Sequence, residues 1–333
     1  MHDLSKGTTI VTGGAGFIGS ALAWALNNRN LDNLWLADFL ENNPAKRRNL
    51  DALAHQRYLD ASELRQLVWE DSAELADVRT IFHLGACSST TETNEAYLHD
   101  NNFLYTKELA EWTLARDIRF VYASSAATYG DGSSGMDDKT DDLEHYHPLN
   151  LYGLSKHKFD LYARDADQLP QIVGLKYFNV YGPNEEHKGD MRSVVSKAFA
   201  QIQETGGMTL FRSHHPNYED GKQLRDFLYV KDAVRMTLFL AENEQANGLF
   251  NLGCGQARSW LDLAQAIFSA LGKDPDVTFI DMPEAIRDKY QYFTQADVSK
   301  LRATGYGDAF FSLEKAVSDY VGNYLLPDKR LGE

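Results

Sequence analysis

Short apolar segments alternate with longer mixed segments along the first half of this chain. The apolar segments have the length of buried strands and lie at residues 9–11, 34–37, 80–86, 119–125 and 171–177. Helical stretches separate them, and strands that alternate with helices form a parallel sheet with helices on both faces. The pattern therefore predicts a doubly wound α/β fold.

The second half of the chain predicts a smaller α/β part. Helical stretches lie near residues 192–204 and 259–271, and turn residues separate them. Ser259 has the side chain of a helix N-cap. We therefore expect a lesser C-terminal domain beside the large sheet, and 333 residues are enough for both.

The first apolar segment leads into a glycine-rich turn. Gly13, Gly16 and Gly19 are spaced as Gly-x-x-Gly-x-x-Gly, and a helix is expected from near Ser20. Glycines at such a turn let the backbone approach a pyrophosphate, and the helix N-terminus favours its negative charge. Asp38 ends the second strand about twenty residues further on, where an acidic side chain meets the adenosine ribose. The stretch predicts a Rossmann-type dinucleotide site.

The dinucleotide site and the second half of the chain together predict two domains. The dinucleotide-binding domain is expected to contain residues 1–178 and returning segments near 226–256. The substrate-binding domain is expected to contain residues 179–225 and 257–333.

The sequence near Asp38 leaves the choice of nicotinamide cofactor open. The carboxylate suits the free 2′-hydroxyl of NAD. Lys46, Arg47 and Arg48 follow closely, and they either neutralise the 2′-phosphate of NADP or form a solvated basic turn. The residues alone do not decide between NAD and NADP.

Tyr152 and Lys156 are four residues apart in a stretch with helical character, so they lie one turn apart on the same face. An ammonium near a phenol favours the phenolate. We therefore expect Lys156 to lower the pKa of Tyr152 from about 10 and to let it exchange a proton with a substrate. The alternative is the start of an ordinary amphipathic helix.

The ends of the predicted strands add to this site. In a parallel sheet, the strand ends at residues 86–88, 124–125 and 179–181 converge on one crevice. Ser125 is then placed to hydrogen-bond the reacting oxygen beside Tyr152, unless it only caps the following turn.

Composition limits the partners and the compartment. A net charge of −15 argues against nucleic acid or an anionic membrane as a general partner. No apolar run follows a basic N-terminus, and no stretch has the roughly 18 apolar residues of a membrane span, so we expect a cytoplasmic protein. Cys87 and Cys254 fit neither a disulfide framework nor a metal-ligand spacing. We expect two buried thiols and no metal.

One basic cluster stands out in this acidic chain. It lies within residues 211–225 and consists of Arg212, His214, His215, Lys222 and Arg225. Arginine binds diphosphates well through its forked donors, so the cluster predicts a phosphate-binding part of a substrate pocket. A solvated loop is the alternative.

Four motifs together resemble the extended short-chain dehydrogenase/reductase superfamily. They are the glycine-rich turn at 12–19, the serines at 124–125, Tyr-x-x-x-Lys at 152–156 and Lys-Tyr-Phe-Asn-Val-Tyr-Gly-Pro at 176–183. Longer stretches resemble one family within it, the ADP-L-glycero-D-manno-heptose 6-epimerases: residues 83–92, 122–130, 186–189 and 292–297. The resemblance spans nearly the whole chain.

The resemblance implies inversion of one carbon of an ADP-heptose, a precursor of the lipopolysaccharide inner core. A bound nicotinamide would take hydride from C6 and return it to the opposite face. Tyr152, with Lys156 and Ser125, would handle a proton on one face and Lys188 on the other. From the bare sequence Lys188 is a surface-loop lysine, but a desolvated lysine beside a cationic nicotinamide is a coherent base.

The resemblance also implies tightly bound NADP, with NAD as the alternative, and a homo-oligomer that is a pentamer. The residues implied for the cofactor are Gly13, Gly16, Phe17, Ile18, Gly19, Asp38, Phe39, Lys46, Leu84, Gly85, Ala86, Cys87, Ser88, Asn101, Lys156, Val180 and Lys188. Those implied for the substrate are Ser125, Asn179, Asp190, Lys197, Phe211, Arg212, Ser213, His214, Arg225 and Tyr290.

Other functions of the same fold were weighed against the residues. Related nucleotide-sugar dehydratases carry Asp-Glu after the strand-end serine, where this chain has Ala126 and Ala127. Methyl groups cannot transfer protons, so we set dehydration aside. A UDP-hexose 4-epimerase would use Tyr152 and Lys156 without Lys188. A catalytically silent dinucleotide-binding sensor is the other alternative, and the intact catalytic residues argue against it.

Overall fold

The computed structural model describes residues 1–40, 43–139, 141–287 and 290–333. Its centre is a seven-stranded sheet in which neighbouring strands are parallel. The strand order is β10 (Gly248–Leu252), β6 (Val173–Tyr177), β5 (Arg119–Ser125), β4 (Val78–His83), β1 (Thr8–Thr12), β2 (Leu34–Asp38) and β3 (Arg57–Asp60). The doubly wound α/β fold predicted from the alternating pattern is confirmed.

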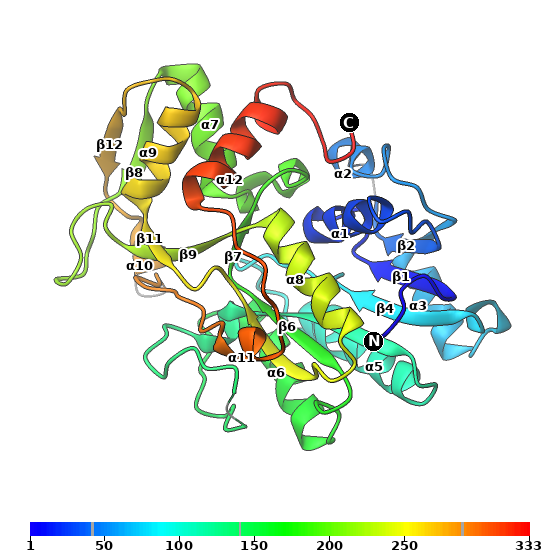
Figure 1. The fold of residues 1–333 in the computed structure, drawn as a ribbon. Helices are drawn as coiled ribbons and strands as arrows, with labels where there is room; N and C mark the ends of the chain where they lie inside the picture. The colour runs from blue at the N-terminus through cyan, green and yellow to red at the C-terminus, as the bar shows by residue number, and fades with distance from the viewer. Residues whose placement is uncertain (41–42, 140, 288–289) are drawn as a thin grey trace.

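Helices cover both faces of this sheet (Figure 1). The buried side chains of α1 (Phe17–Asn27) and α8 (Val230–Glu242) belong to one apolar layer. Those of α3 (Ala61–Trp69), α5 (Tyr105–Leu114) and α6 (Leu151–Asp165) belong to a second layer. Short elements complete this part: α2 (Pro44–Arg48), η1 (Ala73–Leu75), α4 (Glu95–Leu98), η2 (His99–Leu104) and η3 (Ala126–Tyr129).

A smaller part lies to one side of the large sheet (Figure 1). One of its sheets has the order β11 (Ala257–Ser259), β9 (Leu224–Tyr229) and β7 (Asn179–Tyr181), and the other pairs β12 (Val277–Ile280) with β8 (Met208–Phe211). Its helical elements are η4 (Glu186–Met191), α7 (Val194–Thr205), α9 (Trp260–Ala270), α10 (Glu284–Arg287), α12 (Leu313–Tyr320) and η5 (Val321–Leu325). The short helix α11 (Ser299–Ala303) instead lies against β10 of the large sheet.

Two predicted helix starts have different outcomes. The prediction that α1 begins near Ser20 is wrong, because the helix begins at Phe17 with Gly16 as its N-cap. Gly19 therefore lies inside the first turn, where the absence of a side chain lets the helix start close to β1. The predicted N-cap Ser259 is confirmed: its hydroxyl accepts the Asp262 N–H, and Asp262 completes a capping box.

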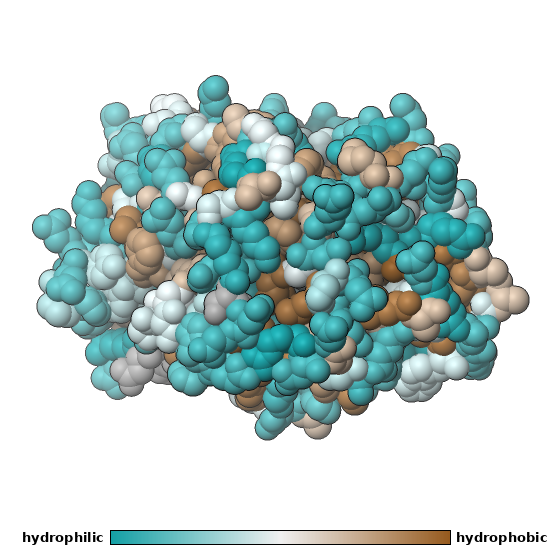
Figure 2. Space-filling model, turned by 60° about the horizontal axis from the view of Figure 1, so that its bottom comes forward, coloured by the Kyte–Doolittle hydropathy of each residue, from teal (hydrophilic) through white to brown (hydrophobic). Residues whose placement is uncertain are grey.

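The surface and the charged groups show two further features of the described residues. None of the helices that the structure describes is long and apolar enough to cross a membrane. Figure 2 shows a face covered mostly by hydrophilic residues, with smaller groups of hydrophobic residues scattered among them. The described part of the chain contains no group of three or more His, Cys, Asp or Glu residues that could hold a metal ion.

Asp226 on β9 ties the smaller part to the end of the large sheet. Its fully buried carboxylate accepts backbone N–H groups from Cys254 at 2.7 Å, Gly255 at 2.9 Å and Ala296 at 3.0 Å. An asparagine has one oxygen instead of two and would aim its own donors at an N–H group. We expect Asp226→Asn to lower the free energy of unfolding by about 1–3 kcal/mol, measured by urea denaturation.

The control for this variant is an acidic residue on the surface. Asp274 is exposed, so Asp274→Asn should change the free energy of unfolding by less than about 0.5 kcal/mol. Equal stability of the Asp226 and Asp274 variants would show that the three buried hydrogen bonds do not hold the two parts together.

Candidate active site

The glycine-rich turn joins β1 to α1 with almost no free space. A Cβ atom at Gly19 would lie 2.0 Å from the carbonyl oxygen of Gly13, and one at Gly13 would lie 2.7 Å from the nitrogen of Gly85. Gly13 also has a φ of +67°, which favours glycine. The backbone of this turn is therefore bare and open to a ligand at the carboxyl end of β1.

Two adjoining cavities of about 300 and 240 Å³ lie at the carboxyl ends of β1, β2 and β4, and together they are in the range of ligand pockets. The structure brings all the predicted cofactor residues to them. The first cavity is lined by Gly13, Gly16, Phe17, Ile18, Gly19, Asp38, Lys46, Leu84, Gly85, Ala86, Ser88, Lys156, Val180 and Lys188. The second adds Phe39, Cys87 and Asn101.

Asp38 and Lys46 form an ion pair at the border of the two cavities. The Lys46 Nζ atom donates to Asp38 Oδ1 at 2.6 Å and to the carbonyl oxygen of Phe39 at 2.6 Å. The other carboxylate oxygen accepts the N–H of Ala15 in the glycine turn at 3.0 Å. Of the three basic residues considered for a 2′-phosphate, only Lys46 lines the cavities, and Arg48 instead pairs with Asp328 and Glu333.

One wall of the first cavity carries the Tyr-Lys pair. Helix α6 begins directly after Asn150, whose side chain accepts the N–H of Gly153 at 2.8 Å, so Tyr152 and Lys156 occupy its first turns. Ser125, the last residue of β5, accepts the Ala127 N–H at 3.1 Å and so caps the following turn, and its hydroxyl also interacts with the Tyr152 phenol. The three residues predicted from the strand ends and the helix therefore meet at one place.

The prediction that Lys156 lowers the pKa of Tyr152 is wrong for this structure. Burial raises the pKa of the Tyr152 phenol, and the hydrogen bond with Ser125 opposes that shift only in part. Burial also lowers the pKa of Lys156 to about 8. Desolvation penalises both charged forms, and it outweighs the attraction that spacing alone suggested.

Lys156 shows how well the cavity suits a dinucleotide. Its side chain is only 3% exposed, and its Nζ atom has no hydrogen-bond partner among the described residues. A buried ammonium needs acceptors, and ribose hydroxyl oxygens can supply them. Together with the bare glycine turn, this unpaired donor fits a nicotinamide dinucleotide in the first cavity.

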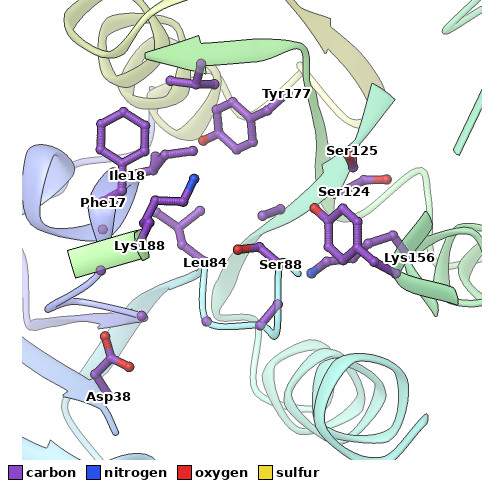
Figure 3. A pocket seen from close by; sticks show the side chains of 18 of the residues that line it. Phe17, Ile18, Asp38, Leu84, Ser88, Ser124, Ser125, Lys156, Tyr177 and Lys188 are labelled. Carbon is purple, nitrogen blue, oxygen red and sulfur yellow. The ribbon is translucent and has the colours of Figure 1, made fainter. Parts of the chain in front are cut away.

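Lys188 reaches the first cavity from the other side. Figure 3 shows it opposite Ser124, Ser125 and Lys156, with its ammonium pointing into the cavity. Its Nζ atom lies 5.3 Å from the centre of the Phe17 ring. Burial lowers the pKa of Lys188, and the charge of Glu185 opposes that shift. The Lys188 amine and the Tyr152 phenol, which is carried by the same helix as Lys156, thus line one cavity.

Comparison with known proteins identifies the family of this chain. A family model described as the NAD dependent epimerase/dehydratase family matches residues 9–253. The ADP-L-glycero-D-manno-heptose-6-epimerase of Nitratidesulfovibrio vulgaris is 47% identical over 321 residues, which cover 95% of this chain and 97% of that protein. The chain belongs to this epimerase family. The protein of the same name from Fusobacterium nucleatum is 44% identical over 326 residues, covering 95% of this chain and 97% of that protein.

Solved structures agree with this assignment. The ADP-L-glycero-D-manno-heptose-6-epimerase of Helicobacter pylori has a TM-score of 0.79 at 28% identity, covering 97% of this chain and 98% of that one. A UDP-N-acetylglucosamine 4-epimerase from Methanobrevibacter ruminantium has a TM-score of 0.80 at 24% identity over 97% and 99% of the two chains, which shows the fold alone. The epimerase-family resemblance found in the motifs is confirmed.

Next to the cofactor cavities, this epimerase has a third cavity of about 230 Å³, lined by residues that include Asn179 and Trp260. Arg225 lies beside it, with its guanidinium 5.5 Å from the Trp260 ring and 5.0 Å from the Tyr290 ring. Arg225 is buried, donates to peptide oxygens of Leu224 and Gln291, and has no carboxylate partner among the described residues. Its uncompensated charge suits an anionic ligand.

Of the remaining predicted substrate residues, Ser125 lines the first cavity, and six do not line any of these three cavities: Asp190, Lys197, Phe211, Arg212, Ser213 and His214. Arg212 pairs with Asp220 at 3.0 Å, and the N–H of Ser213 donates to the same carboxylate at 2.8 Å. Lys197 donates to the carbonyl oxygen of Asp190 at 3.3 Å. Phe211 ends β8, and the N–H of His214 donates to the Tyr292 hydroxyl at 3.3 Å.

Sequence reasoning missed several lining residues of the epimerase cavities. His187 lines both cofactor cavities, and Tyr177 and Phe178 line the first. His187 lay within the quoted 186–189 motif, which was the one signal for it. Trp260 follows the predicted N-cap Ser259, but nothing in the sequence indicates that this aromatic side chain faces a cavity rather than the core.

Proposed function

We propose that the protein interconverts ADP-D-glycero-D-manno-heptose and ADP-L-glycero-D-manno-heptose, a step that supplies lipopolysaccharide core synthesis. Membership of the epimerase family supports the substrate. The single observation that carries the mechanism is that Tyr152 and Lys188 line the same cavity, with Lys188 opposite Lys156, which lies one helical turn from Tyr152 on α6 (Figure 3). Inversion at one carbon needs a proton handler on each face, and this geometry supplies two.

The division of work follows from the protonation states. A nicotinamide dinucleotide held at the glycine turn and Lys156 would supply a hydride acceptor and donor for C6 of the sugar. Burial keeps the Tyr152 phenol neutral and able to donate a proton, and burial lowers the pKa of Lys188, which favours an amine able to accept one. Each residue can therefore exchange the proton of the C6 oxygen from its own side. Ser125 lines the same cavity beside Tyr152, where its hydroxyl would orient the phenol toward that oxygen.

The cofactor that we propose is tightly bound NADP. Lys46 is the cavity-lining cation beside Asp38, and its attachment to Asp38 and Phe39 holds the ammonium where a 2′-phosphate would follow the ribose. Without Lys46, the Asp38 carboxylate would repel that phosphate.

Removal of the Lys46 ammonium should weaken the binding of NADP more than the binding of NAD. We expect Lys46→Ala to weaken NADP binding about 10- to 100-fold and to change NAD binding less than about 3-fold, measured by titration of cofactor-stripped protein. Arg47→Ala, which changes a neighbouring cation that does not line the cavities, is the control. An equal loss for both cofactors would contradict recognition of a 2′-phosphate by Lys46.

We also propose a route for the nucleotide part of the substrate. Arg225, Asn179 and Tyr290 would bind the ADP moiety at the third cavity, with the diphosphate on the unpaired guanidinium. Phe211, Arg212, Ser213, His214, Asp190 and Lys197 stay proposed contacts of that outer region. The proposed division of labour assigns the cofactor to residues 1–178 with 226–256, and the substrate to 179–225 with 257–333. The proposed setting is a cytoplasmic homopentamer, by resemblance to the family.

The test is an NMR assay with ADP-D-glycero-D-manno-heptose and no added cofactor. Appearance of the C6 epimer would establish the reaction and the retained cofactor together. Turnover of UDP-glucose or UDP-galactose instead would favour a 4-epimerase. Absence of any turnover with NADP and NAD supplied would favour a non-catalytic dinucleotide sensor.

A further inference from the structure

The loop that carries Lys188 is fastened to the glycine turn through two buried asparagines. The Asn49 Nδ2 atom donates to the carbonyl oxygen of Ala15 at 3.0 Å and to that of Asn184 at 3.1 Å. The Asn184 side chain donates to the Ser20 hydroxyl at 2.9 Å. The start of the loop is therefore tied to the element that would hold the pyrophosphate.

The buried Glu185 and the partly buried Glu186 follow Asn184 and lie directly before the His187–Lys188 pair. Glu185 is satisfied by neutral donors, among them the Ser193 hydroxyl at 2.6 Å and the Tyr320 hydroxyl at 3.0 Å. Glu186 instead faces a cation: Arg330 Nε lies 3.2 Å from Glu186 Oε2, an ion pair without the geometry of a hydrogen bond, and the Arg330 and Glu186 side chains are 6% and 18% exposed. A carboxylate this buried depends on its partner to stay charged and in place.

Arg330 belongs to a segment that contacts both sides of the cofactor cleft. The N–H of Leu331, one residue on, donates to Asn184 Oδ1 at 2.9 Å. Arg48 on α2 pairs with Asp328 at 2.8 Å and with Glu333 at 2.8 Å. Figure 1 shows this end of the chain beside α2, the helix that carries Lys46. Residues 328–333 thus join the Lys188 loop to α2.

We propose that residues 328–333 form a strap that positions Lys188, with Arg330 as the positioning residue acting through Glu186. The inference rests on the proposed role of Lys188 as a proton handler. Loss of the Arg330 charge would leave the Glu186 carboxylate buried and unpaired, so the loop would shift to hydrate it. Lys188 lies two residues further on, and His187 between them lines both cofactor cavities, so the same shift would disturb the proton handler and the cofactor wall.

Arg330→Gln tests the strap by two independent readouts. We expect kcat to fall about 10- to 100-fold while KM for the sugar nucleotide stays within about 3-fold, because a displaced amine reacts poorly without losing substrate contacts. Hydrogen exchange of a peptide covering 184–193 should become about 10-fold faster. The Lys188 N–H donates to the Glu185 carbonyl oxygen and the Ser193 N–H donates to the Glu185 carboxylate, and both hydrogen bonds should open more often when the loop is no longer held.

Matched variants separate positioning from general damage. Arg330→Lys keeps the charge and should stay within about 3-fold of the parent kcat. The double variant Glu186→Gln, Arg330→Gln leaves no unpaired carboxylate. Its kcat should be at least that of Arg330→Gln alone, and its hydrogen exchange should be no faster. Arg29→Gln removes an exposed ion pair with Glu242 and should change neither readout.

The outcomes divide cleanly between the two proposals. Unchanged exchange in Arg330→Gln, or faster exchange with kcat within about 2-fold of the parent, would overturn the strap. If Arg330→Gln fails to fold, Arg330→Lys is compared with the double variant Glu186→Gln, Arg330→Gln, which has no ion pair. An equal loss of activity in these two variants would overturn the strap. An inactive parent protein would refute the proposed function, and exchange, which needs no turnover, would still decide the strap.

Discussion

Tyr152→Phe and Lys188→Met are each expected to lower kcat for C6 inversion about 100- to 10,000-fold, which is the range for loss of a general acid or base. Each change removes the proton-exchanging atom and keeps most of the side-chain volume. Tyr152 and Lys188 line the same cavity, and Lys188 lies opposite Lys156 on the helix that carries Tyr152, so under the proposed mechanism neither can replace the other on its own face. The measurement is the NMR assay, with bound cofactor quantified after denaturation.

Two neighbours on α6 provide matched controls. The Tyr162 hydroxyl donates to Glu111, and Lys158 pairs with Glu95, both outside the cofactor cavities. Tyr162→Phe and Lys158→Met should keep kcat within about 2-fold of the parent. Retention of more than a tenth of the parent kcat by Lys188→Met would leave Tyr152 as the sole proton handler and would contradict the two-sided mechanism.

Gly19→Ala is the second variant with a large expected effect. The added Cβ atom would lie 2.0 Å from the Gly13 carbonyl oxygen and 2.7 Å from its carbon, and both are backbone atoms that cannot rotate away. The turn must open, which should lower the free energy of unfolding by about 1–3 kcal/mol or more and misplace the N–H groups that face a pyrophosphate. We expect the purified variant to lack cofactor and to melt at lower temperature.

Gly322→Ala is the matched control for this methyl group. Gly322 is exposed in η5. Apart from its chain neighbours and the backbone of its own helix, no atom of the described residues lies within 4 Å of a Cβ atom built there. The free energy of unfolding should stay the same or rise slightly, because alanine restricts the unfolded chain. A Gly19 variant as stable and as rich in cofactor as the Gly322 variant would show that the turn tolerates a side chain and does not hold the pyrophosphate closely.

The parts of the site that follow from local sequence were predicted well. Apolar segments such as 119–125 marked strands, and a parallel sheet requires their carboxyl ends to meet, which brought Ser125 beside Tyr152. The glycine spacing and Asp38 marked the first βα turn for the same reason. These features depend on residues within one strand-turn-helix unit, so periodicity and spacing are sufficient to find them.

Features that depend on contacts between distant segments could not be predicted from local sequence patterns. Lys188 lines the cavity from a loop that contacts distant residues such as Asn49, Ser20 and Leu331, whereas local sequence alone indicates a surface lysine. The raised pKa of Tyr152 comes from burial, which no i,i+4 spacing reports. The contact between Arg330 and Glu186 joins residues far apart in the sequence, so no local pattern predicts it.

The most direct test of the central claim follows an isotope at the inverted carbon. ADP-D-glycero-D-manno-heptose carrying deuterium at C6 is incubated with the protein in ordinary water, and the unlabelled compound is incubated in heavy water. Hydride transfer to a bound nicotinamide and back predicts an L-glycero product that keeps its deuterium in the first reaction and gains none at C6 in the second. Loss of the label to solvent, or gain of solvent deuterium at C6, would contradict transient oxidation and would show inversion by direct removal of a proton.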